Sequence, residues 1–240
     1  MRECCLAVKA GFSSFLMTPP AIVEPIIMIT TTATMATLPE VTFLIISNPL
    51  AANLFVIGIM FIGFAGYVLY RFIMKKQNAE VDSGFGIFLI GTGVYAAFYG
   101  LIYSVLWPAP MGGSYSILFG DPLALLGIVS VLTGVIVLKK ASLAFGGIFA
   151  FFAGIYAVVS GYGGYVLGMT RSPLALLLMY LGAGIGGIFV APMVSTKNKT
   201  VVTVTAILVV IAFVGAALIA LYTGYSAVGE HLAAFKNAAG

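Results

Sequence analysis

The sequence predicts an all-α integral membrane protein, in which six transmembrane helices form three parallel hairpins and an additional N-terminal helix precedes them. The first observation is composition: 62% of the 240 residues are hydrophobic, 8% are charged, and the mean hydropathy is +1.16. A soluble domain carries about 25% charged residues. The second observation is a series of long uncharged runs, and the third is the placement of lysine and arginine between those runs.

Each uncharged run is long enough to cross a bilayer, which requires about 20 apolar residues in a helix. Charged residues are absent from residues 41–70, 83–120, 122–138, 141–170, 172–196 and 200–229. We therefore expect spanning helices at Pro49–Met74, Gly84–Trp107, Pro122–Leu138, Ser142–Tyr165, Pro173–Val194 and Val201–Tyr225.

Three of the expected helices begin with a related tetrapeptide, a polar residue followed by Pro-Leu-Ala. The polar residues are Asn48, Asp121 and Ser172. A short polar side chain that caps the first turn, followed by proline at the first helical position, is typical of a helix start. We therefore expect the Asp121 carboxylate to cap the third helix, at the end of a loop over residues 107–121.

The six-helix domain at residues 49–225 follows an N-terminal extension at residues 1–48. Within the extension, Ala21–Leu38 is 18 residues long but contains five threonines, so it is only weakly apolar. It either spans the bilayer or lies at its surface. A spanning helix would place Arg2 and Lys9 on the same face as the other basic loops, which favours an additional transmembrane helix.

Lysine and arginine follow the first, third and fifth helices, so they lie on one face of the membrane. These residues are Arg71, Lys75, Lys76, Lys139, Lys140, Lys197 and Lys199. Loops rich in lysine and arginine stay in the cytoplasm. We therefore expect a multi-pass cell-membrane protein whose Trp107–Asp121 loop and C-terminal tail, residues 226–240, are extracytoplasmic. Because the basic residues are confined to short loops, they indicate the orientation of the chain in the membrane. No nucleic-acid partner is expected.

An internal repeat supports the hairpin arrangement. A pattern of glycines and aromatic residues in the second helix recurs in the fourth with a constant offset of 61, so that Gly86, Gly93 and Gly100 correspond to Gly147, Gly154 and Gly161. Parallel repeats of this kind occur in some transporters. The alternative is a chance match, because short motifs in membrane helices have a high false-positive rate.

Small residues recur every four positions on three of the expected helices. They are Gly146, Ala150 and Gly154, the pairs Gly182/Gly186 and Ala183/Gly187, and the series Ala212, Ala216, Ala220 and Gly224. This spacing lets two helix backbones approach closely, which is how helices associate in lipid. We favour helix packing over the alternative that the glycines line a pore.

The uncharged runs contain no group suited to proton-coupled, redox or catalytic chemistry. Buried ionisable side chains mark proton relays and ion-coupled carriers in membranes. The single histidine, His231, lies in the tail, so the bundle lacks the ligands of a haem, zinc or di-iron site and the residues of a catalytic triad. We therefore expect no enzymatic activity, no catalytic residue, no cofactor and no metal.

Two sets of polar and aromatic residues are candidate sites. The first set, an outward surface for a partner or a lipid headgroup, comprises Trp107, Tyr115, Phe119 and Asp121. Trp107 and Tyr115, together with Tyr103, also suit an interfacial aromatic belt. The second set, a polar pathway through the membrane, comprises Thr92, Tyr95, Tyr99, Tyr156 and Tyr162. The alternative for the buried tyrosines is a hydrogen bond to a neighbouring carbonyl.

The stretch before the third helix resembles a family of archaeal membrane proteins of unknown function, in which a proline-glycine loop precedes Tyr-x-Ile-x-Phe-Gly-Asp-Pro. The matching residues here are Tyr115, Ile117, Phe119, Gly120, Asp121 and Pro122. Asn48 stands where the family would have aspartate before its first span. The resemblance covers about residues 45–225. It implies an archaeal cell membrane and supplies no activity.

These features predict a non-catalytic integral subunit or scaffold of a larger membrane complex, such as a respiratory complex. Its partners would be the lipid bilayer and other integral membrane subunits, and a homo-oligomer is compatible with the same features. The alternative is a channel or carrier for a small neutral solute, indicated by the repeat and the intramembrane tyrosine and threonine residues. A third hypothesis is a lipid- or quinone-binding subunit whose reactive groups come from partner chains.

Overall fold

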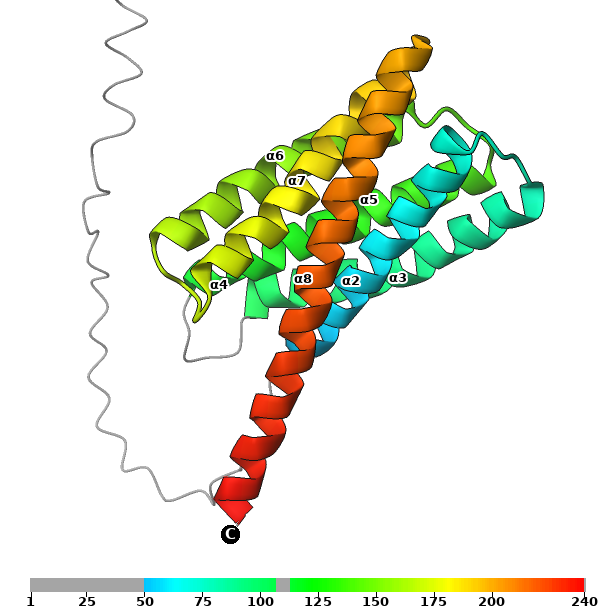
Figure 1. The fold of residues 1–240 in the computed structure, drawn as a ribbon. Coiled ribbons are helices and arrows are strands. Elements are labelled where there is room, and N and C mark those ends of the chain that lie inside the picture. Colours follow the sequence, from blue (N-terminus) through cyan, green and yellow to red (C-terminus); the bar gives the residue numbers. More distant parts are fainter. Residues whose placement is uncertain (1–49, 107–112, 240) are drawn as a thin grey trace, which may run out of the picture. The chain divides into compact units, whose positions relative to one another are not determined.

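The computed structural model describes residues 50–106 and 113–239, which contain helices and no strand. The elements are α2 (Leu50–Val68), η1 (Leu69–Ile73), α3 (Ala79–Leu106), α4 (Gly113–Tyr115), η2 (Ser116–Gly120), α5 (Asp121–Leu138), α6 (Ala144–Val166), α7 (Pro173–Ser195) and α8 (Lys199–Ala239) (Figure 1). The elements η1 and η2 are π-helical turns. The expected N-terminal helix, Asn48 and Trp107 lie outside the described residues.

Six segments are long and apolar enough to cross a membrane, which confirms the predicted fold class. They are Leu50–Ile73, Ala79–Val105, Gly113–Leu138, Ala144–Val166, Pro173–Ser195 and Lys199–Glu230. Three expected boundaries are wrong. The second span begins at Ala79 instead of Gly84. The third span begins at Gly113 instead of Pro122 because α4 and η2 continue directly into α5. The last helix continues past Tyr225 to Ala239.

The six long helices form a closed ring in the order α2, α3, α5, α6, α7, α8. Within this ring α3 packs closely on α5, α6 packs on α7, and α8 packs on both α7 and α2 (Figure 1). The α2–α3 and α5–α6 contacts are much sparser. In all three expected hairpins, therefore, the main contact of each helix is with a neighbouring hairpin, although α8 contacts α7 almost as extensively as α2. The last helix closes the ring on the first.

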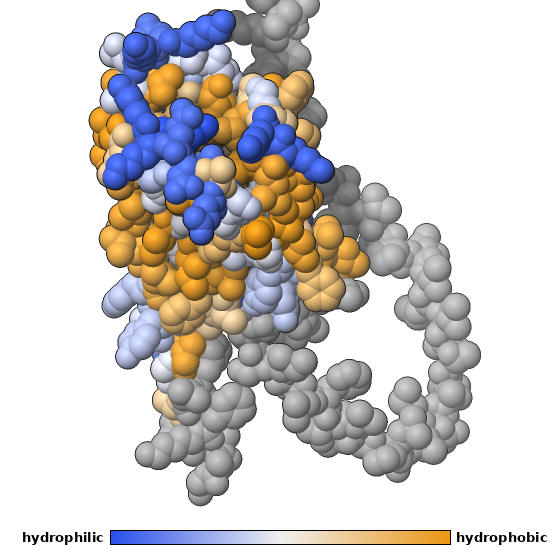
Figure 2. Space-filling model, turned by 90° about the vertical axis from the view of Figure 1, so that its right-hand side faces the viewer, coloured by the Kyte–Doolittle hydropathy of each residue, from blue (hydrophilic) through white to orange (hydrophobic). Residues whose placement is uncertain are grey.

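The three basic connections lie together at one end of the bundle. Helices that follow one another run in opposite directions, so the α2–α3, α5–α6 and α7–α8 connections share an end, and η2 and the α6–α7 connection lie at the other (Figure 1). Figure 2 shows hydrophilic side chains gathered towards one end and an apolar surface beyond them. Large apolar side chains on that surface suit contact with lipid, as at Val105, which is 77% exposed.

Glycines set the distance between α3 and α5. A Cβ atom on Gly127 would lie 2.2 Å from the backbone nitrogen of Ala97, and one on Gly100 would lie 2.2 Å from that of Ala124. A third contact involves Gly93, where the added atom would lie 2.8 Å from the nitrogen of Val131. The obstructing atoms are backbone atoms, which cannot rotate away. Only glycine therefore permits this interhelical contact.

The small residues spaced four positions apart were expected to mediate helix packing, and they do so at the α6–α7 and α7–α8 interfaces. A Cβ atom on Gly154 would lie 2.6 Å from the carbonyl oxygen of Gly184, and one on Gly182 would lie 2.8 Å from that of Ala212. Ala216 is 1% exposed in the core between α7, α8 and α2. The packing interpretation is confirmed at these positions, although Gly154 also borders a cavity described below.

Candidate functional site

A cavity of about 150 Å³ lies inside the ring of helices. Its walls come mainly from α2, α5, α6 and α7, and the lining is apolar except at Asn53, Tyr67, Thr133 and Tyr180. The lining follows α2 from Leu50 and continues into η1 as far as Phe72. At 1.5 Å per residue this is about 33 Å, close to the thickness of the hydrocarbon core of a bilayer. The cavity therefore extends through most of the membrane-spanning part.

The π-helical turn η2 changes the role of Asp121. The backbone N–H of Asp121 donates to the carbonyl of Ser116, five residues earlier. Gly120 already has helical dihedral angles, φ −68° and ψ −56°, and no side chain caps α5. The expectation that Asp121 caps a helix is therefore wrong, because the helix has begun before it. Its carboxylate is free to bond sideways to other helices, and π-turns of this kind are frequent at functional sites.

Asp121 connects three helices through hydrogen bonds to hydroxyl groups. The Ser104 hydroxyl of α3 donates to Oδ1 at 2.6 Å, and the Tyr156 hydroxyl of α6 donates to Oδ2 at 2.8 Å. Gly120 makes this possible, since a Cβ atom there would lie 2.6 Å from the backbone nitrogen of Ser104. Charge-assisted bonds to a carboxylate are roughly twice as strong as neutral ones. We call Ser104, Asp121 and Tyr156 the outer cluster.

Two further tyrosines hold η2 in place. The Tyr180 hydroxyl of α7 donates to the carbonyl of Leu118, and the Tyr115 hydroxyl donates to the carbonyl of Met169 at 3.0 Å. Phe119 stacks on Tyr115 with ring centroids 6.2 Å apart and also lines the cavity. Two residues of the Tyr-x-Ile-x-Phe-Gly-Asp-Pro stretch, Phe119 and Pro122, thus line one end of the cavity.

A second carboxylate lies at the opposite end, beside the other π-turn. The Tyr67 hydroxyl donates to Asp82 Oδ1 at 2.9 Å, and Arg71 Nη1 lies 3.8 Å from Asp82 Oδ2. The Tyr67 ring stacks on Phe85 at 3.9 Å with an interplanar angle of 7°. Tyr67 and Phe85 also line the cavity. We call Tyr67, Arg71 and Asp82 the inner cluster.

A family model described as "Protein of unknown function (DUF981)" matches residues 44–234, which include both clusters and all six spans. The chain belongs to the DUF981 family. This confirms the expected membership of a family of unknown function. No curated protein and no solved structure matches the chain.

The inner cluster of this DUF981 chain was missed in the sequence. Its only local signal is a pair of opposite charges, Arg71 and Asp82, on either side of a short connection. Tyr67 gave no signal, because one tyrosine near the end of an apolar run is common in membrane helices.

Ionisable residues do occur within the spans, contrary to expectation. Asp121 lies inside the span Gly113–Leu138, and Asp82 lies inside the span Ala79–Val105. The expectation failed because both spans begin earlier than the apolar runs suggested. Carboxylates inside a membrane are costly and usually have partners, as both of these have. Among the described residues, no group of three or more His, Cys, Asp or Glu side chains could hold a metal ion.

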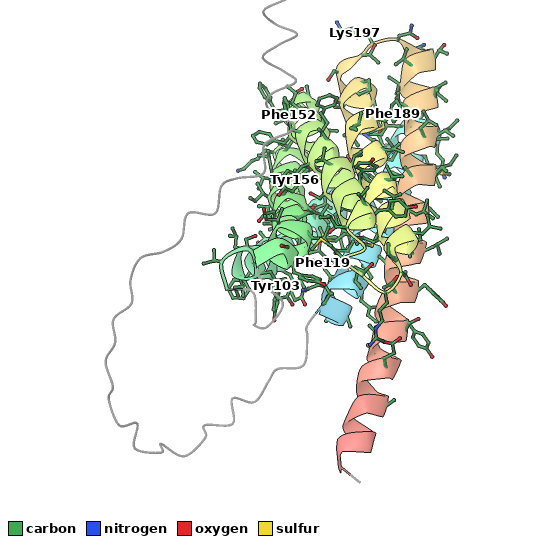
Figure 3. All side chains as sticks on the ribbon, turned by 90° about the vertical axis from the view of Figure 1, so that its left-hand side faces the viewer. Tyr103, Phe119, Phe152, Tyr156, Phe189 and Lys197 are labelled. Atoms are coloured by element: carbon green, nitrogen blue, oxygen red, sulfur yellow. The ribbon has the colours of Figure 1, made fainter. Side chains whose placement is uncertain are left out.

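The structure brings together part of the first candidate set. Tyr115, Phe119 and Asp121 are half-buried at η2, and their contacts described above are with their own chain. Figure 3 shows Phe119 and Tyr156 on the side of the bundle away from Lys197. Tyr103, expected in an aromatic belt, is instead 3% exposed, and its hydroxyl accepts a hydrogen bond from Asn53.

The second candidate set is divided between two helices. Thr92, Tyr95 and Tyr99 lie on α3, whereas Tyr156 and Tyr162 lie on α6, and none of the five lines the cavity. The Thr92 hydroxyl donates to the carbonyl of Phe88 at 2.8 Å, and Tyr162 is 62% exposed on the lipid-facing surface. The structure therefore does not assemble these residues into one continuous path.

We expect Tyr156→Phe to destabilise the protein, because it leaves the Asp121 carboxylate with one hydroxyl donor fewer. Loss of a hydrogen bond to a partly buried charged group costs about 1–3 kcal/mol, which corresponds to a decrease of several degrees in Tm for a chain of this size. The measurement is thermal unfolding of the detergent-purified protein. Tyr162→Phe, on the same helix but exposed to lipid, is the matched control and should leave Tm unchanged. Equal Tm values for the two variants would contradict the assigned role of the outer cluster.

Proposed function

We propose that the protein is a non-catalytic integral subunit or scaffold of a larger assembly in the membrane. The observation that supports this is the length of α8, which has 41 residues. At 1.5 Å per residue it is about 60 Å long, twice the thickness of the hydrocarbon core. Figure 1 shows the C-terminal end of α8 running well past the other helices. We call residues 226–239 the α8 arm.

Among the described residues, the α8 arm receives little support from the rest of the chain. Arg171 Nη1 lies 2.9 Å from Glu230 Oε2, but the two side chains are 87% and 63% exposed. An exposed ion pair of this kind contributes about 0–1 kcal/mol. An isolated helix of about 14 residues is only marginally stable in water. A helical arm of this length is therefore best explained by another chain that packs against it.

The base of the arm offers aromatic contact area on the same side of the membrane. Tyr222 and Tyr225 are each 75% exposed. Tyrosine and other aromatic residues are enriched where subunits meet. A second integral membrane chain, of this kind or another, would cover the arm and these rings together.

Deletion of residues 229–239 should release the protein from its assembly. In native gel electrophoresis of mild-detergent extracts, we expect the full-length chain to migrate with companion chains at fixed stoichiometry and the truncated chain to migrate at lower mass. Glu230→Gln removes the exposed ion pair and keeps the arm, so it is the control and should migrate like the full-length chain. If the full-length chain migrates as a single copy without companions, the proposal is wrong.

We also propose that the basic end of the bundle is cytoplasmic and that η2 and the α8 arm are extracytoplasmic. The support is the positive-inside rule, together with the placement of all three basic connections at one end. The resemblance described above supports an archaeal cell membrane as the location that we propose.

Single-cysteine labelling tests this orientation. With Cys4 and Cys5 replaced by serine, we expect Ser114→Cys to react with a membrane-impermeant maleimide in intact cells. Ala141→Cys, at the opposite end, should react only after permeabilisation, and both positions are exposed in the structure. Reaction of both cysteines from the same side would contradict the orientation.

A second candidate function is a channel or carrier for a small neutral solute, which the central cavity and the sparse α2–α3 and α5–α6 contacts favour. If it is correct, purified protein in liposomes should accelerate swelling in glycerol or urea. Ala153→Phe would place a ring in the cavity and abolish the acceleration, whereas Tyr162→Phe would not. Swelling at the rate of protein-free liposomes would exclude this candidate for these two solutes.

A further inference from the structure

Asn53 is the most unusual residue that lines the cavity. It lies in the first turn of α2, its exposed fraction is 0%, and its Nδ2 donates to the Tyr103 hydroxyl at 3.1 Å. Its Oδ1 is buried without a hydrogen-bond partner. Buried side-chain polar atoms in native proteins nearly always have a partner. Because Asn53 lines the cavity, a rotation of its side chain would present this oxygen to a group supplied from outside the chain.

The cavity beyond Asn53 suits an apolar chain. Between Asn53 and Tyr67 the α2 wall consists of apolar residues, over about 21 Å at 1.5 Å per residue. A water molecule needs roughly 10–15 Å³ of cavity volume. The volume of about 150 Å³ therefore has room for about ten to fifteen groups of the size of a water molecule. A methylene group is of similar size, so the cavity could hold an alkyl chain of about that many carbon atoms. Cavities with an apolar lining stay dry and bind apolar molecules.

The unpartnered Oδ1 of Asn53 restricts which polar group the ligand can carry. An amide oxygen only accepts hydrogen bonds, so the ligand must bring a donor, which a carbonyl group lacks. Within the described part of the chain no lysine or arginine lines the cavity, so a phosphate or carboxylate headgroup would be buried without a counter-charge from these residues, which is strongly unfavourable. A neutral hydroxyl group satisfies both conditions.

We propose that the cavity binds a long-chain alcohol, a neutral lipid with one hydroxyl group. Its hydroxyl donates to Asn53 Oδ1 at the end of the cavity near the outer cluster. Its chain lies along α2 and ends near Phe85 and the inner cluster. The two carboxylate clusters hold the ends of the cavity, and their carboxylates are occupied by Ser104, Tyr156 and Tyr67. They leave Oδ1 as the acceptor for the ligand.

The α5–α6 contact gives this lipid a route from the bilayer. Both helices line the cavity, yet they touch each other sparsely. On the α6 side of this contact, Gly146 faces Thr133 and Ile136 of α5 without a side chain of its own. At Gly146 an added Cβ atom would meet nothing closer than Thr133 Oγ1 at 3.3 Å, in contrast to the tight contacts of α3 with α5. The inference goes beyond the proposed role in an assembly and does not depend on it.

Photolabelling of the full chain in lipid nanodiscs tests the proposal. The probe is a diazirine derivative of dodecan-1-ol, about twelve carbons long to match the cavity, and the competitors are dodecan-1-ol and its methyl ether, which has lost the donor. We expect label on cavity-lining peptides of α2, α5 and α6. The alcohol should compete about five- to tenfold better than the ether, as expected for one neutral hydrogen bond.

Three variants make the result specific. Asn53→Leu should abolish the preference for the alcohol over the ether. Ala153→Phe should abolish the labelling itself, and it keeps the proposal testable if Asn53→Leu does not fold. Tyr162→Phe is the control and should behave as the unaltered protein. Equal competition by alcohol and ether, or label confined to lipid-facing residues such as Phe98 and Val105, would overturn the proposal.

Discussion

Backbone contact at the glycines of α3 and α5 is the constraint on which the rest of the structure depends. Lipid supplies no hydrophobic drive for helices to associate, so close approach must supply the dispersion energy. At Gly120 the same closeness brings Ser104 to the carboxylate of Asp121. The hydroxyl of Tyr156 then connects this pair to α6. One property of the sequence, the absence of a side chain at defined positions, thus controls both the packing and the polar cluster built on it.

The two ends of the cavity use the same combination of parts. Each has a π-helical turn, a carboxylate and a tyrosine hydroxyl that donates to it. A π-turn inserts one extra residue per turn and rotates the following side chains around the helix axis. The turn η2 in this way directs the Asp121 carboxylate towards α3 and α6, whereas the turn η1 carries Arg71, which pairs with Asp82 of α3. The interior between the two ends is left almost wholly apolar, with Asn53, Thr133 and Tyr180 as the polar exceptions.

Helix positions could be predicted from the sequence because apolar runs and Pro-Leu-Ala starts are local signals. The hydrogen-bond partners of Asp121 could not be predicted. An Asp-Pro pair has the same local preference whether the helix starts there or, as here, has already begun at Gly113. The pairing of α3 with α5 was also beyond reach, because glycine spacing shows that a helix has a close contact but not with which neighbour. Tyr67 of α2 and Asp82 of α3 meet across the sparse contact between these two consecutive helices.

The ring order has a consequence for biogenesis. Among the described spans, α2 is the first to leave the ribosome and α8 is the last. Phe61 of α2 nevertheless stacks on Phe213 of α8. With synthesis at about 5–20 residues per second, the two rings are separated by roughly 10–30 s. During that interval the glycine- and alanine-rich side of α2 must be shielded by lipid or by the insertion machinery. Ring closure therefore waits until α8, the last of the described spans, has been made, and until then Phe61 lacks its stacking partner.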